Sequence, residues 1–192
     1  RILRTPKTIR SDKQMEKEFI EKCEEIFEKR TLTAITEDDL IRWENITGFS
    51  LNEELKYIIS NHSTVFLRDG LGVYSEDKSP VADEEGTEPF MFFLGFKGRD
   101  TLFSVYETYK DQIEKDIYPI AMADGGDLWC IDENGRIFLW LHDEPDNNAY
   151  EIFDSVAEMI FSIREVTYKE EPSGVIEEES WLPDDFFVAL EK

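Results

Sequence analysis

Cysteine and long apolar runs are both scarce in this chain of 192 residues. Cys23 and Cys130 are its two cysteines, which excludes a disulfide-rich scaffold. Both occupy apolar positions of their segments, so we expect buried free thiols and a reducing compartment, the cytoplasm. No run of about eighteen apolar residues occurs, so the sequence predicts no membrane-spanning helix.

Histidine is equally rare, so the sequence offers few candidate catalytic residues. His62 and His142 are far apart and form no HExxH motif. No Gly-x-Ser-x-Gly elbow is present. We therefore expect no enzymatic activity and no cofactor.

A metal site is the competing interpretation for the acids near predicted strand ends. Their spacing does not match an EF-hand loop, and turn chemistry explains Asp124 and Asp127 without an ion. Gly125 and Gly126 connect two strands rather than opening a helix, as a phosphate cradle would. We expect no bound metal.

Basic residues are outnumbered: 21 lysines and arginines face 44 aspartates and glutamates, giving a formal net charge of −23. Such a surface repels nucleic acids and anionic membranes, and it attracts cationic proteins. We expect no nucleic-acid or membrane binding and a basic protein partner. The alternative is that the charge serves solubility alone. The oligomeric state is left open.

The length and a hydrophobic content of 41% fit one globular domain with added termini. Residues 1–10 carry four basic residues and no acid, which indicates a basic arm or linker. Residues 11–166 form the predicted domain. Residues 167–192 form an acidic tail with a short amphipathic helix after Pro183. That helix docks either on its own domain, which we prefer, or on a partner.

Three helices are predicted before any strand. The first runs from Ser11 to about Lys29 with an apolar stripe. The second is capped by Thr36 and ends at Gly48, and the third follows a capping box of Ser50 and Glu53. The stripe of the first helix consists of Met15, Phe19, Cys23, Ile26 and Phe27.

From Thr64 onward the pattern favours strands. Residues 65–74 predict a short hairpin around Asp69-Gly70, and an acidic loop follows over 75–88. The apolar run 90–96 predicts a central strand. A helix capped by Asp100 comes next, and a last strand (149–153) precedes a helix capped by Ser155.

The most strongly patterned stretch, residues 117–144, predicts three successive strands with tight turns. Pro119 suits an edge strand or a strand start. An acidic Gly-Gly turn follows at 124–127. Asn134-Gly135 then indicates a type I′ hairpin turn, which requires positive φ at both central residues.

This stretch also resembles the signature of the SUKH superfamily, which covers fungal cell-wall regulators of the Smi/Knr type and bacterial immunity proteins that neutralise toxins. The resemblance spans about Thr36 to Ile163 and includes an upstream helix with Trp43 and Glu44. Ser50-Leu51 departs from it, because the family usually has Leu-Pro there. The matching residues are Pro119, Ile120, Ala121, Asp124, Gly125, Gly126, Asp127, Cys130, Ile131, Asp132, Gly135, Phe138, Trp140, His142, Asp143 and Glu144.

Together these patterns predict an α+β fold with a mixed, mostly antiparallel sheet of about six strands and helices mainly on one face. The resemblance implies a non-enzymatic immunity protein that binds a toxin, here a basic one and possibly a nuclease. The alternative is a regulatory scaffold that recruits signalling or cell-wall partners. The predicted binding residues, which a plain solvated loop face would also explain one by one, are Asp124, Asp127, Asp132, Glu133, Trp140, His142, Asp143, Glu144, Glu84 and Glu85.

Overall fold

The computed structural model describes residues 12–28, 35–60, 65–76, 79–145 and 148–166. The predicted basic arm, the acidic tail and His62 lie outside these residues. The helices are α1 (Asp12–Ile26), α2 (Glu37–Thr47), α3 (Glu53–Ser60), α4 (Leu102–Tyr109) and α5 (Val156–Ser162). The strands are β1 (Val65–Phe66), β2 (Leu71–Tyr74), β3 (Thr87–Glu88), β4 (Phe92–Phe93), β5 (Ile117–Met122), β6 (Leu128–Asp132), β7 (Ile137–Trp140), β8 (Ala149–Phe153) and β9 (Arg164–Glu165).

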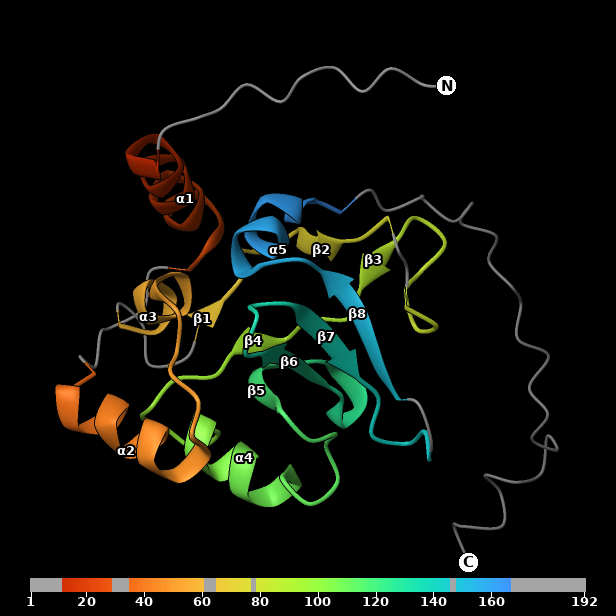
Figure 1. Ribbon diagram of the computed structural model, residues 1–192. Coiled ribbons are helices and arrows are strands. Elements are labelled where there is room, and N and C mark those ends of the chain that lie inside the picture. Colours follow the sequence, from red (N-terminus) through yellow and green to blue (C-terminus); the bar gives the residue numbers. More distant parts are fainter. Residues whose placement is uncertain (1–11, 29–34, 61–64, 77–78, 146–147, 167–192) are drawn as a thin grey trace, which may run out of the picture.

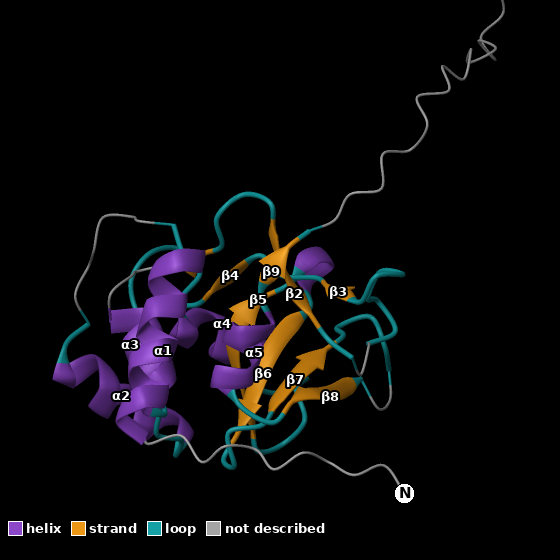
Figure 2. Cartoon of the chain, turned by 90° about the horizontal axis from the view of Figure 1, so that it is seen from above, coloured by secondary structure: helices purple, strands orange, loops and turns teal. Residues whose placement is uncertain are grey.

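The strands form two sheets. The larger has the order β1-β4-β5-β6-β7-β8, and the smaller has the order β3-β2-β9. Every pair of neighbouring strands in both is antiparallel. Helices α1, α2 and α3 group together to one side of the large sheet (Figures 1 and 2). The predicted α+β class and the six-stranded sheet are confirmed.

Local capping signals place several of the helices. Thr36 caps α2 in a reciprocal capping box with Asp39, and Gly48 ends the helix at a φ of 75°. The predicted cap of α3 is wrong, because the Asn52 side chain, rather than that of Ser50, accepts the Leu55 N–H.

At two further helix starts the cap is a side-chain hydroxyl. Thr101, not the predicted Asp100, caps α4 by exchanging hydrogen bonds with Ser104. Ser155 caps α5 as predicted. A hydroxyl beside an acid therefore takes the capping position at α4.

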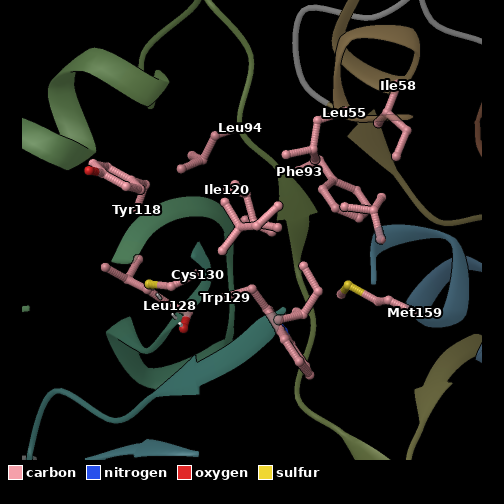
Figure 3. Close-up of a cluster of buried hydrophobic side chains, with 14 of the residues drawn as sticks. Leu55, Ile58, Phe93, Leu94, Tyr118, Ile120, Leu128, Trp129, Cys130 and Met159 are labelled. Atoms are coloured by element: carbon pink, nitrogen blue, oxygen red, sulfur yellow. Dashed lines mark hydrogen bonds between the residues drawn. The ribbon is translucent and has the colours of Figure 1, made fainter. Parts of the chain in front are cut away.

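The core joins the helices to the centre of the large sheet. Figure 3 shows Phe93, Trp129 and Met159, from β4, β6 and α5, gathered around one apolar interior. All three side chains are fully buried. Most of the predicted stripe of α1 is buried as well, but Met15 is 52% exposed and lies outside the core.

Strand pairing departs from the predictions where it depends on distant parts of the chain. β1 and β2 form no hairpin, because β1 pairs with β4 in the large sheet while β2 pairs with β3 and β9 in the small one. β5 is a central strand in spite of Pro119, where the register with β6 shifts. A bulge tolerates proline because a ladder hydrogen bond is already missing there.

The hairpin between β6 and β7 differs from the predicted type I′ turn. Gly135 has a φ of 87°, but Asn134 is not among the described residues with positive φ. The Gly135 N–H donates to the Asp132 carbonyl at 3.0 Å, and the Asp132 N–H donates to the Arg136 carbonyl at 3.1 Å. The connection is therefore a three-residue loop in which only the glycine enters the left-handed region.

Candidate functional site

The predicted binding residues separate to the two ends of strand β6. Asp127 precedes β6 and Asp132 ends it, so the two are about 16 Å apart at ~3.3 Å per residue. His142 and its neighbours follow β7, whose last residue pairs with Leu128, and therefore lie at the Asp127 end. Glu133 follows Asp132 at the opposite end. One continuous patch containing all ten residues does not form.

Asp132 organises the β6–β7 hairpin rather than facing a partner. Its carboxylate is buried and accepts the backbone N–H groups of Asn134 and Arg136, both at 2.9 Å. The Arg136 guanidinium also donates to it, with Nε at 2.8 Å and Nη2 at 2.7 Å. Burial alone would raise the pKa of Asp132, but these hydrogen bonds and the arginine charge outweigh it and lower the pKa below 3.8.

Trp140 does not belong to an exposed surface, so this part of the prediction is wrong. Its side chain is 1% exposed and packs edge-on against Tyr109 of α4 at 5.7 Å between ring centroids. Leu139 and Trp140 are adjacent in β7 and both are buried, so both faces of the sheet are covered at this point, and a buried tryptophan removes much apolar area from water.

His142 connects the turn after β5 with the loop after β7. Its backbone N–H and its ring Nδ1 both contact Asp127 Oδ1 at 3.0 Å, and its Nε2 lies 3.0 Å from Asp143 Oδ1. The hydrogen bond to Asp127 raises the pKa of His142 above 6.5, and the charges of Asp143 and Asp127 add to this effect. The Asp127 carboxylate thus serves as a fixed link, whereas the Asp143 side chain is 89% exposed.

Internal hydrogen bonds also hold the loop between β7 and β8. The Tyr150 hydroxyl donates to Glu144 Oε2 at 2.7 Å. The Asn148 amide donates to the carbonyls of Leu141 and Glu144 at 3.1 and 3.0 Å. Glu144 is consequently kept at the same end of the sheet as Asp143.

The loop before β3 joins this end of the sheet. Asp83 and Asp124 line one groove of about 350 Å³, together with Glu88 and apolar side chains. Glu84 and Glu85 follow Asp83 in the chain and are exposed. We name this surface the acidic end; its members are Asp83, Glu84, Glu85, Asp124, Asp127, Asp143 and Glu144.

Two residues at the groove were missed from the sequence. Asp83 is not among the predicted binding residues, although it belongs to the same acidic loop as Glu84. The sequence predicts Glu88 at the end of an acidic loop, but it is 2% exposed and pairs with Val73 across β2 and β3. The Thr-Glu-Pro sequence around it is too short to show strand alternation, so little in the sequence indicated its burial.

The described residues offer little for other chemistry. None of their His, Cys, Asp and Glu side chains form a group of three or more that could hold a metal ion. Cys23 and Cys130 are buried free thiols as expected, and burial raises the pKa of Cys23 to about 12. Among the same residues, no helix has the length and apolar character needed to cross a membrane.

Comparison with protein-family models identifies one family, and two individual proteins are also similar to this chain. The model of the SMI1 / KNR4 family (SUKH-1) matches residues 34–162. A Bacillus subtilis (strain 168) protein named "SPbeta prophage-derived uncharacterized protein YokK" is 36% identical over 76 residues, which is 36% of this chain and 40% of that protein. A crystal structure of a protein from Pseudomonas syringae pv. tomato is 23% identical, covering 74% of this chain and 92% of that one, with a TM-score of 0.47.

Proposed function

Because the chain belongs to the SMI1 / KNR4 family (SUKH-1), we propose that it is a non-enzymatic immunity protein that binds and neutralises a basic toxin, with a nuclease as the leading type. The resemblance of its central strands to immunity proteins supports this choice. We place the protein in the cytoplasm in this proposal, because both described cysteines are free and buried.

The observation that carries the proposal is the acidic end of the sheet. Three segments that are distant in sequence meet there, and the exposed carboxylates of Asp124 and Asp143 belong to two of them. A toxin that handles nucleic acid carries positive charge where phosphates bind. Anionic side chains on a fixed frame would occupy that site and accelerate association.

The test is co-expression of this chain with the toxin domain encoded beside it in its genome of origin. Growth should be restored by the native chain and lost again when three acids of the acidic end are neutralised together. A matched control neutralises three exposed acids on or near α2 and α4. The test set is Glu85→Gln, Asp124→Asn and Asp143→Asn, and the control set is Asp38→Asn, Asp111→Asn and Glu114→Gln.

Binding kinetics give the second readout for the purified pair. Raising the salt concentration should slow association more than it speeds dissociation, because steering acts over a Debye length of about 8–10 Å. An association rate that does not change with salt concentration would argue against the acidic end as the toxin-binding surface. Equal loss of growth rescue in both triple variants would do the same. Binding to several signalling proteins instead of a toxin would favour the scaffold alternative, which rests on the tail outside the described residues.

A further inference from the structure

The groove at the acidic end is apolar along much of its wall, although the surface around it is charged. Val81 is 46% exposed there, and Leu71, Pro89 and Phe90 are only partly buried. The volume of about 350 Å³ is close to the lower limit of small-ligand sites, which span roughly 300–1,000 Å³. The groove is therefore suited to one or two large apolar side chains rather than to a whole helix.

The chain leaves the described domain beside this groove. Strand β9 pairs with β2 in the small sheet (Figure 2), and Val166, which follows β9, lines the groove and is the last described residue. The Val166 N–H donates to the Gly70 carbonyl at 2.8 Å, which holds this point of exit against the small sheet. The residues that follow Val166 therefore start at the rim of the groove.

The predicted acidic tail, which lies outside the described residues, contains apolar side chains of the size that the groove admits. Trp181 is 15 residues beyond Val166. A linker of that length spans up to about 50 Å when it is extended, so it can reach any part of the groove. A segment tethered in this way has an effective concentration of the order of mM, so a modest affinity is enough for docking. The large apolar residues of the tail segment 181–190 are Trp181, Leu182, Phe186, Phe187 and Leu190.

We propose that the Trp181-Leu182 pair docks in the groove of its own chain. Leu182 precedes Pro183, which disfavours helical backbone at Leu182, so the pair belongs to an extended segment narrow enough to enter. The apolar residues after Pro183 fall in the predicted helix, which at about 10 Å across is too wide for the groove. The indole would lie against Val81 and Phe90, and its N–H would donate to a carboxylate at the rim.

The charge of the tail opposes this docking and gives it a distinctive salt dependence. Residues 167–180 carry five glutamates and one lysine, and Asp83 and Asp124 line the groove. Salt screens the repulsion between like charges, so docking should become more complete as the salt concentration rises. A basic partner at the acidic end should respond in the opposite direction. The inference concerns this chain alone, so it stands or falls independently of the proposed function.

Quenching of tryptophan fluorescence by acrylamide tests the docking in the full chain. Trp43, Trp129 and Trp140 are each at most 1% exposed, so the emission that acrylamide reaches reports on Trp181. We expect the native chain to be quenched little more than Trp181→Phe, which retains only the buried tryptophans, and we expect any excess to shrink as salt is added. A Trp181 emission quenched as strongly as that of free N-acetyl-tryptophanamide would overturn the proposal.

Variants locate the docked tryptophan. Val81→Asp adds a charge to the groove wall at an exposed position and should raise the quenching several-fold, toward that of the free indole. Ile41→Asp is the matched control, because Ile41 is 49% exposed on α2 and does not line the groove, and it should change nothing. Equal quenching of Val81→Asp and the native chain would overturn the assignment. Increased quenching in Ile41→Asp alone would place the tryptophan on α2 and would overturn it too.

A second measurement leaves the groove itself unaltered. Replacing Trp181 and Leu182 by serine in the ¹⁵N-labelled full chain should shift the amide resonances of Leu71, Val81 and Phe90 and leave those of α2 in place. Shifts confined to residues away from the groove would refute the docking site. Protection of Trp181 that is lost on dilution would assign the tryptophan to the groove of a second copy, which would overturn docking within one chain.

Discussion

Removing the Asp132 carboxylate should destabilise the domain, because five donors converge on it. Two are the backbone N–H groups of Asn134 and Arg136, two belong to the Arg136 guanidinium, and the fifth is the Asn134 side-chain amide at 3.3 Å. A hydrogen bond to a charged group contributes about 1.5–3 kcal/mol net, and water at this turn replaces part of what is lost. We expect Asp132→Ala to cost about 3 kcal/mol of unfolding free energy.

Asparagine at the same position gives a graded comparison. Its carbonyl oxygen still accepts the two backbone N–H groups, but its amide would face the donors of Arg136. Asp132→Asn should therefore cost about 1.5–2 kcal/mol, which is less than alanine. The neighbouring exposed Glu133 is the control, and Glu133→Gln should stay within about 0.5 kcal/mol of the native chain.

Urea unfolding followed by tryptophan fluorescence at pH 7 measures these differences. With an m value of about 2 kcal/mol/M, the alanine variant should unfold at a urea concentration about 1.5 M lower. The folded-state pKa of Asp132 is lowered, so its contribution is present above pH 3.8 and lost as the pH falls through the folded value. The difference between native chain and Asp132→Asn should therefore shrink in acid. A cost below 1 kcal/mol for alanine, or a difference that grows in acid, would refute this account.

Three further changes test other parts of the structure. The pKa of His142, measured by NMR titration, should lie above 6.5 and should fall in Asp127→Asn. Protonated His142 stabilises the fold fully below pH 6.5, and this stabilisation is lost as the pH rises through the pKa of His142 in the folded state. An unchanged pKa in Asp127→Asn would exclude the bond between His142 and Asp127 as the cause. Gly135→Val should cost about 1–2 kcal/mol by melting, because φ is 87° there; an added Cβ meets nothing within 4 Å, so the cost comes from the backbone, and unchanged melting would contradict the loop conformation. Gly72→Ala should cost about 1–3 kcal/mol in urea, because its Cβ would meet two methyl carbons at 2.8 and 2.9 Å; a more stable variant would contradict this packing.

Features that depend on a few neighbouring residues were predictable from the sequence. The capping box of Thr36 and Asp39 and the left-handed Gly48 are examples, because every partner lies within one helical turn. The predicted type I′ turn is wrong even though its residues are neighbours in sequence. An aspartate two residues before Asn134 offers its carboxylate to the turn backbone, and that bond stabilises the three-residue loop instead.

Features that depend on distant partners were not predictable in the same way. The separation of β1 and β2 into different sheets is decided by β4 and β9, which lie about 25 and 90 residues farther along the chain. The burial of Glu88 likewise depends on Ser79 and on its pairing with β2. Local periodicity carries no information about such pairings.

The same limitation explains why the binding residues were only partly located. Composition shows that the chain is strongly acidic, but it does not distinguish acidic side chains that form hydrogen bonds within the domain from those that face solvent. Asp132 and Asp127 each have donors within 3.0 Å and hold two segments together. The Asp143 side chain is 89% exposed, and its carboxylate contacts the ring of His142. The internal acids thereby fix the frame on which the exposed ones are presented, so Asp127 should affect partner binding through position rather than contact.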